Sequence, residues 1–392
     1  AGFWAGIFYS LLPLSVYYSR TFQAESLLLF LASLSLERFL IYKRKPTLIS
    51  FSICCLCFTL ACLIKVLPLI WLGLPLLFIS TSNAYFFEIR SLKISLFRIF
   101  NNLISMRFVL FLFITLFCLI SWYLYAYYLG ISSGNSFGFW GDSSDRSSIK
   151  LILDFRTWID LLIRIVIRNL ALFGLPILIF GLLKNTHVFG RNLLLVGFFG
   201  VFLSTIFSMR SSSIHEYYQL PLQLYACPLM GYGMTNIKSF YSSYLLKKYL
   251  SKIFITLITF VSLIVLNFDY FAVEKSQSKI WMPLANEIRK TLPIDGKLVS
   301  VSGNDPTLLN LARRQGWLTS ADKIDKTSLQ NWSEKGASYI VGSLDWSNSY
   351  TPFYNQDEKN KVAKHLCTFQ LAHDCPTSPH NIYMIPLSDF NK

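Results

Sequence analysis

The sequence has little charge for its length. Charged residues make up only 15% of the 392 residues, whereas soluble domains carry about 25%. Hydrophobic residues make up 53%, with 34 Phe, 21 Tyr and 9 Trp among the aromatic residues. This composition excludes a disordered chain, a coiled coil and an ordinary soluble enzyme. It is typical of a protein that lies in a membrane.

Several common binding motifs are absent. The sequence holds no Walker loop and no Rossmann glycine fingerprint, so nucleotide binding has no support. The net charge is +15, but the basic residues fall in short gaps between apolar runs. A nucleic-acid-binding protein would gather them on a soluble face. We therefore expect no nucleic-acid partner, and we expect membrane lipids beside these basic gaps.

The cysteines give little sign of a metal site or a disulfide framework. Six of the eight Cys lie in apolar runs, where a free thiol behaves as a small hydrophobic group. Cys54, Cys55 and Cys57 cluster, but a structural zinc site needs four ligands. Cys367 and Cys375 flank a short turn in the polar C-terminal part and are a candidate disulfide if that part lies outside the cytosol. Their spacing alone leaves the pairing open.

Nine apolar runs predict a polytopic α-helical membrane protein, because a helix needs about 20 apolar residues to cross a bilayer. The predicted spans are 1–17, 24–41, 47–63, 66–80, 107–128, 161–183, 192–209, 214–234 and 253–271. The stretch 47–80 is too long for one crossing and contains Lys65 and Pro68. We interpret it as a hairpin of two spans.

The positive charges predict an orientation for these spans. If residue 1 starts on the cytoplasmic side, most Lys and Arg of the first 271 residues fall in cytoplasmic connections. These connections are 38–46, 81–107, 184–191 and 235–252. The distribution follows the positive-inside rule and predicts a multi-pass inner-membrane protein. Residues 81–106 and 154–160 are predicted to form amphipathic helices at the membrane interfaces.

The composition changes to that of a soluble domain near residue 272. We therefore predict a transmembrane domain over 1–271 and a small α/β domain over 272–392. Strands are expected at 297–302, 338–343 and 381–386, and helical patterns at 278–291, 306–314 and 357–367, with a further segment at 326–335. Counting the predicted spans places this domain on the outer, periplasmic side.

Polar side chains gather at the predicted outer ends of the spans. A charge in or near hydrocarbon costs on the order of 3 kcal/mol, so such residues are candidates for function. They are Arg20, Glu25, Lys65, Arg164, Arg168, Arg210, His215 and Glu216. A shared outward-facing cavity would explain why all of them fall on one predicted side.

The segment RSSSIHEYYQLP (210–221) is the richest of these sites. His215, Tyr217 and Tyr218 can donate hydrogen bonds to phosphate oxygens. The other interpretation is an aromatic belt at the start of a helix. The same choice applies to YYSRTFQAE (17–25), where Arg20 can snorkel and Glu25 can favour a helix N-terminus. Lys65, in CLIKVLP (62–68), can also be an ordinary turn lysine.

These segments together resemble one family. YYSRTFQAE, the LIKVLP turn, HEYYQLP and LARRQGW (311–317) are similar to motifs of GT-C membrane glycosyltransferases. The resemblance is to bacterial relatives of protein O-mannosyltransferase and lipid A aminoarabinose transferase, and it covers nearly the whole chain in span order. It implies inverting transfer of a sugar from a polyprenyl-phosphate donor to an acceptor hydroxyl of a lipid, glycan or protein at the outer face.

The resemblance also assigns roles to residues. Glu25 stands at an acidic position of the second outer loop, usually Asp in the family, with an orienting or metal-binding role. Lys65, Arg210, His215 and Tyr218 match positions that face the lipid phosphate. Arg20 and Tyr217 complete the expected substrate-binding set. No organic cofactor is implied, and a divalent cation at Glu25 stays open.

The family's main catalytic carboxylate follows its first span, and no residue here corresponds to it. We therefore expect a preceding N-terminal piece that carries this acid, or a chain that is inactive alone. Two other functional classes remain open: a transporter or lipid flippase, and an O-antigen ligase or polymerase. A flippase would have broken spans with charges near the midplane. A non-catalytic scaffold is the remaining interpretation if no such piece exists.

Overall fold

The computed structural model describes residues 1–21, 23–81, 106–133, 149–184, 188–240, 244–303, 305–345, 357, 359–362 and 382–387. Most of these residues are helical, with one small sheet near the C-terminus. The chain divides into two compact units, Ala1–Asn267 and Phe268–Lys392. The sequence predicts the boundary a few residues later, after residue 271.

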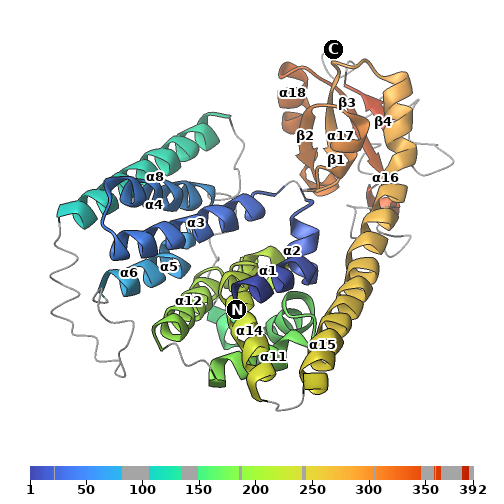
Figure 1. The fold of residues 1–392 in the computed structure, drawn as a ribbon. Coiled ribbons are helices and arrows are strands. Elements are labelled where there is room, and N and C mark those ends of the chain that lie inside the picture. The colour runs from blue at the N-terminus through green and yellow to red at the C-terminus, as the bar shows by residue number, and fades with distance from the viewer. Residues whose placement is uncertain are drawn as a thin grey trace. The chain divides into compact units, whose positions relative to one another are not determined.

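The described part of the first unit consists of helices (Figure 1). Its first half contains α1 (Gly2–Leu11), α2 (Pro13–Tyr18), α3 (Glu25–Arg44), α4 (Leu48–Ile64), α5 (Pro68–Trp71), α6 (Gly73–Thr81) and α8 (Met106–Ser133). Its second half contains α9 (Ile149–Leu153), α10 (Phe155–Arg164), η2 (Ile165–Asn169), α11 (Gly174–Lys184), α12 (Val188–Phe207), α13 (Met209–Ile214), η3 (Glu216–Gln219), α14 (Pro221–Phe240) and α15 (Tyr244–Val265). The π-helical segment η4 (Leu266–Phe271) crosses into the second unit.

Three helical runs are long and apolar enough to cross a membrane. They are Val109–Leu129 in α8, Phe189–Phe207 in α12, and an apolar stretch of the run Tyr249–Thr291. A fourth is obtained if Phe155–Asn169 and Gly174–Leu183 count as one bent span. Of the nine predicted spans, the described residues therefore support three or four by length and composition. Leu48–Ile64 and Pro68–Ser80 are apolar but shorter.

Proline breaks the predicted first span into two helices. Leu12 separates α1 from α2 with an extended backbone, φ −69° and ψ 136°. It precedes Pro13, and a residue before proline avoids the helical region because its backbone clashes with the proline ring. The expectation of one helix over 1–17 is therefore wrong.

The predicted span 161–183 is also interrupted. After α10 the chain forms the π-helical turn η2 and then bends by 96° before α11. Ala171 and Leu172 adopt left-handed φ values of 48° and 57° at the bend. This conformation is costly for residues with a side chain, so the surrounding structure must hold it. α10 itself contains most of the interfacial helix predicted at 154–160, and the Asp154 side chain caps its N-terminus.

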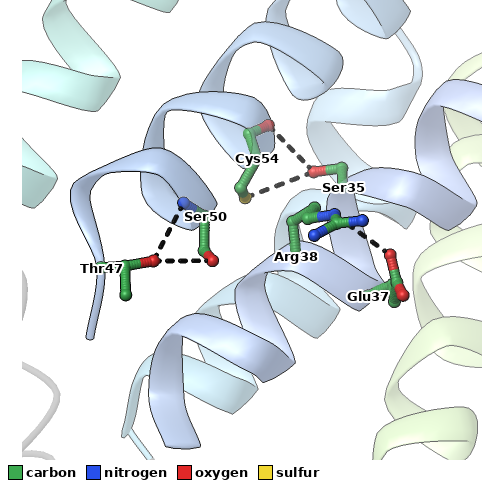
Figure 2. A network of polar contacts seen from close by, with 6 residues as sticks. All are labelled: Ser35, Glu37, Arg38, Thr47, Ser50 and Cys54. Carbon is green, nitrogen blue, oxygen red and sulfur yellow. Dashed lines mark hydrogen bonds and ion pairs between the residues drawn. The ribbon is translucent and has the colours of Figure 1, made fainter. Parts of the chain in front are cut away.

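Buried polar contacts join α3 to α4, which pack along each other (Figure 1). Figure 2 shows Ser35 of α3 donating to the carbonyl of Cys54 at 3.2 Å, with the Cys54 thiol 3.5 Å away. At the start of α4, Thr47 Oγ1 accepts from the backbone N–H of Ser50. The Cys54 thiol is free and buried, as are those of Cys57 and Cys62. The cluster thus behaves as the packing group that the sequence predicts.

The second unit is a small α/β domain. Its strands β1 (Lys297–Val301), β2 (Gly316–Thr319), β3 (Ala337–Ser343) and β4 (Ile382–Pro386) form one sheet in the order β2-β1-β3-β4. β1 runs parallel to β2 and β3, and β4 is antiparallel to β3. Its helices are α16 (Ala272–Thr291), α17 (Thr307–Ala312), η5 (Ala321–Lys323) and α18 (Lys326–Glu334).

Alternation along the strands gives this sheet two apolar faces. Leu298 and Val341 pack with Trp281 and Ile288 of α16. Val299 of β1 and Ile340 of β3, the next residues along or before these on their strands, pack on the other face with Leu329 of α18. The strands expected at 297–302, 338–343 and 381–386 are confirmed, and β2 is an additional strand.

Some predicted features lie outside the described residues. They are the interfacial helix at 81–106, apart from its ends, and the candidate disulfide between Cys367 and Cys375. Of the predicted helix 357–367, residues 357 and 359–362 are described and are helical.

Candidate functional site

Four separate segments of the first unit meet around η3. They are the turn between α2 and α3, the connection between α4 and α5, the segment from α13 to α14, and η2, which lies at the bend of the bent span. Proline at the start of a helix makes two of these connections tight, since Pro68 begins α5 and Pro221 begins α14. The tight connections bring side chains distant in sequence into contact.

An ion pair joins two of the predicted site residues. The Lys65 ammonium group pairs with the Glu25 carboxylate. Glu25 is the first residue of α3, where the helix dipole favours a negative charge, and it is 4% exposed. Burial lowers the pKa of Lys65, and the nearby Glu25 carboxylate opposes this shift. Glu25 therefore holds the charge of Lys65 in a site that would otherwise disfavour it.

The predicted aromatic residues surround Lys65. Its Nζ lies 4.2 Å from the centre of the Tyr217 ring and 4.6 Å from that of Tyr218. The Tyr217 ring stacks on that of Tyr218, with centres 5.0 Å apart, and on the His215 ring at 5.1 Å. Cation–π contact stabilises a desolvated ammonium group. The HEYY segment is thus a stacked platform that fixes the position of the lysine.

A second ion pair lies beside this platform. Glu216 accepts from Arg168 of η2 and from the Tyr18 hydroxyl, the latter at 3.3 Å. Arg164, one turn earlier, donates to the carbonyl of Ser213 at 2.6 Å. Charge-assisted hydrogen bonds, which are stronger than neutral ones, therefore join the bent span to η3 through Glu216 and to α13 through Ser213.

The two remaining predicted residues lie at exposed positions. Arg20 is exposed in the turn after α2. Arg210 is exposed on α13 and, among the described residues, takes no part in the contacts around Lys65. The structure therefore brings together Glu25, Lys65, His215, Tyr217 and Tyr218, but leaves Arg210 outside their contacts.

Two cavities share Lys65 and Tyr218. The smaller, which Glu25, Tyr217 and Trp71 also line, has about 10 Å³ of free space, room for about one water. The larger has a volume of about 470 Å³, within the range of about 300–1,000 Å³ of ligand pockets. Its lining is mostly apolar and includes Ile70, Trp122 and Phe207. We call this larger space the Lys65 cavity. It combines a hydrocarbon-like wall with one cation.

The site does not fit a protein-held metal ion. Among the described residues, no three His, Cys, Asp or Glu side chains gather as a ligand set. Glu25, the predicted candidate ligand, is occupied by Lys65. Its geometry favours an orienting role over metal binding.

Sequence reasoning missed a group of buried carboxamides next to this site. Asn169 of η2, Gln219 of η3 and Gln223 of α14 are 0–3% exposed. Among the described residues, neither polar side-chain atom of Asn169 or of Gln219 has a hydrogen-bond partner, and Oε1 of Gln223 has none either. Such groups are rare in folded proteins. The sequence signal for these residues was a neutral amide next to an apolar run. This is a weaker indication of function than a charged residue at the same place.

The chemistry of this arrangement follows from its charges. Lys65 pairs with Glu25 and Arg168 pairs with Glu216, and Lys65 also lines the mostly apolar Lys65 cavity. The site can therefore hold a singly charged anion against Lys65 while an apolar chain lies along the wall of the Lys65 cavity. Comparison with known proteins adds no identity: no protein-family model matches the chain, and no curated protein matches it.

Proposed function

We propose that this chain is the membrane part of a glycosyltransferase that takes a sugar from a polyprenyl-phosphate donor at the outer face of the inner membrane. The proposal rests on the Lys65 cavity, in which a half-buried cation lies at an apolar wall. A polyprenyl phosphate has the matching structure, a long hydrocarbon chain ending in one anionic group. The resemblance to GT-C enzymes supports the same substrate.

The Lys65 ammonium group would bind the phosphate and stabilise the charge that grows on it. In the reaction, an acceptor hydroxyl oxygen forms a bond to the anomeric carbon. The bond from that carbon to the phosphate oxygen breaks, and its electron pair leaves with the phosphate. A preorganised cation in a site with little water is well suited to stabilising that charge. Tyr217 and Tyr218 would hold the ammonium group in place.

A carboxylate must accept the proton of the acceptor hydroxyl. Glu25 is poorly placed for this step while it pairs with Lys65, and Glu216 is paired with Arg168. We therefore propose that Glu25 positions Lys65. The general base would come from the N-terminal piece that the resemblance implies.

The proposed arrangement in the membrane has nine spans and the second unit in the periplasm. The positive-inside distribution of Lys and Arg supports it. On this arrangement the connections that carry Glu25, Lys65 and His215 all face the periplasm, where the lipid-linked donor would be used.

The experiment is a transfer assay with the complete protein in proteoliposomes and a labelled polyprenyl-phosphate sugar. Lys65→Met should reduce transfer at least about a hundredfold, as expected when a group that stabilises the transition state is removed. Lys252→Met is the matched control, because Lys252 is exposed on α15, and it should retain activity. Equal transfer by the two variants would disprove the role of Lys65.

One observation favours a second candidate, a flippase for a lipid-linked sugar. The bent span carries a π-helical turn, two left-handed residues and the buried Asn169, and broken spans mark the substrate sites of transporters. An assay that measures the movement of a labelled lipid-linked sugar between leaflets separates the two. Movement without transfer to any acceptor would favour the flippase.

A further inference from the structure

The Lys65 cavity offers more than a cation and an apolar wall. Its lining comes from the connection between α4 and α5, from α8, from the chain around α13 and from η3. Besides Lys65, the lining includes two serines, two tyrosines and a tryptophan. Lys65 is the only charged residue in the described lining. The other polar groups are therefore neutral, and they suit the uncharged part of a ligand.

The two serines of this lining, Ser208 and Ser211, differ in their hydrogen bonds. Ser208 donates to the carbonyl of Ser204 at 2.7 Å and is 8% exposed, so its hydroxyl is already used. Ser211 is half-buried, and its hydroxyl forms no hydrogen bond with any residue that the structure describes. Its oxygen is not one of the unpaired polar atoms that the described protein buries completely. The Ser211 hydroxyl is therefore available to a ligand in the cavity.

Trp122 presents an aromatic surface to the same cavity. It belongs to α8, is 49% exposed and lies in the cavity wall. Its ring centre is 6.3 Å from that of Tyr125, which is not part of the lining. The face of an indole is apolar and carries the negative side of its quadrupole, so it attracts C–H groups that are slightly positive. A sugar ring presents such C–H groups on its faces and hydroxyls at its edge.

We propose that the Lys65 cavity takes an uncharged sugar, with the Trp122 indole against one face of the sugar ring and the Ser211 hydroxyl bonded to a sugar hydroxyl. This rests on the proposed function and deepens it, since Lys65 binds the phosphate and the two other residues recognise the sugar. The sugar is bonded directly to the phosphate of the donor, so it lies in the same cavity. The hydrocarbon chain then follows the apolar lining near Ile70 and Phe207.

The charge of the lining argues against an amino sugar. An ammonium group on the sugar would lie near the Lys65 ammonium group, and like charges repel each other. Glu25 does not offset this repulsion, because it pairs with Lys65 and lines the smaller cavity instead. The described lining of the Lys65 cavity contains no acidic residue. The cavity therefore favours a neutral sugar over its amino counterpart.

The first experiment measures the affinity of the complete protein in nanodiscs, without an acceptor, for three matched lipids. They are a polyprenyl phosphate, its glucosyl ester and its glucosaminyl ester. The glucosyl ester should bind at least about tenfold tighter than the glucosaminyl ester, equivalent to about 1.4 kcal/mol. Equal binding of the two esters, or tighter binding of the glucosaminyl ester, would overturn the inference of an uncharged sugar.

The role of Trp122 is tested by comparing the ester with the bare phosphate. Trp122→Leu should weaken binding of the glucosyl ester about tenfold and leave binding of the polyprenyl phosphate unchanged. Trp122→Phe keeps a ring and should retain most of the affinity. Tyr128→Leu is the control, because Tyr128 is 67% exposed on α8 and is not in the lining. An equal loss for both lipids would assign Trp122 to the hydrocarbon chain or the membrane and overturn its role.

Ser211 has a matched control on its own helix. Ser211→Ala should weaken binding of the glucosyl ester about fivefold, equivalent to about 1 kcal/mol, as expected for a neutral hydrogen bond. Ser213 donates to the carbonyl of Arg210 at 2.8 Å and does not line the cavity, so Ser213→Ala should bind the ester normally. Equal losses in the two serine variants would contradict the contact between Ser211 and the sugar.

Lys65→Met separates this inference from the proposed function. It should weaken binding of all three lipids, because each carries the phosphate. If it does so while the Trp122 and Ser211 variants bind the glucosyl ester as the unchanged protein does, the sugar contacts are disproved and the phosphate site stands. If Lys65→Met binds all three lipids unchanged, the proposed function itself fails.

Discussion

The ammonium group of Lys65 lies 4.2 Å from the centre of the Tyr217 ring while it pairs with the carboxylate of Glu25. A single side chain thus connects three segments that lie far apart in the sequence. Its position depends on a carboxylate at a helix N-terminus and on a stacked aromatic platform.

Removing the charge of Glu25 should destabilise the first unit. Glu25→Gln leaves the Lys65 ammonium group in a largely buried position without its counter-ion, and we expect a loss of about 1–3 kcal/mol. Thermal unfolding in detergent measures it. Glu37→Gln is the control, because the Glu37 side chain is 56% exposed in its pair with Arg38, and it should cost no more than about 0.5 kcal/mol. Equal losses of stability in the two variants would show that the Glu25–Lys65 pair contributes no more than a surface ion pair.

The pair between Arg168 and Glu216 should couple the bent span to η3. A double-mutant cycle with Arg168→Met and Glu216→Gln should give a coupling energy of about 1–2 kcal/mol, since the two groups are in direct contact. The control cycle combines Arg164→Met with Glu216→Gln, because Arg164 donates to the Ser213 carbonyl and not to Glu216. Its coupling with Glu216 should stay below about 0.5 kcal/mol. Similar values from both cycles would argue against a specific pair.

Transfer should decline at alkaline pH because Lys65 loses its charge. Burial lowers the pKa of Lys65, so deprotonation occurs below the usual lysine value of about 10.4. The neutral amine no longer attracts phosphate, and activity falls as the pH rises through this pKa. Lys65→Arg keeps a charge at every accessible pH. The activity that this variant retains should not decline at alkaline pH. If the decline is the same in Lys65→Arg, a group other than Lys65 causes it.

The left-handed backbone at the bend should make glycine favourable there. Ala171 has φ 48° and is fully buried. Ala171→Gly relieves about 1–2 kcal/mol of backbone strain and loses about 0.8 kcal/mol of methyl burial, so it should be neutral or slightly stabilising. Ala126→Gly, within α8, should destabilise by about 1 kcal/mol. A clear loss of stability at Ala171 would mean that the bend is not strained.

Hydropathy and charge predicted much of this architecture, because apolar runs and strand alternation are local properties of the chain. The helices of the first unit and three strands of the second unit follow from them. The breaks in the helices were not predicted from hydropathy or charge. Pro13 was visible within the predicted span 1–17, but the apolar run outweighed it. The bend at Ala171 and Leu172 was not predicted, although Gly174 and Pro176 follow it directly in the sequence.

The candidate site was predicted in composition but not in pairing. The polar residues at span ends were recognisable, and Glu25, Lys65 and Tyr217 do meet. Spacing along the chain could not tell that Lys65 would take Glu25 as its partner, or that Arg168 would take Glu216. Those choices depend on how helices distant in sequence pack. Gln219 was overlooked because a neutral amide beside an apolar run carries a weaker cost than a charge.

The most direct test of the central claim is the affinity of the complete protein for a polyprenyl phosphate, measured without an acceptor. The account predicts that Lys65→Met weakens binding at least about tenfold, because a charge-assisted contact to phosphate contributes more than about 1.4 kcal/mol. Lys252→Met should bind as the unchanged protein does. Equal affinities for all three proteins would contradict the assignment of Lys65 to the lipid phosphate.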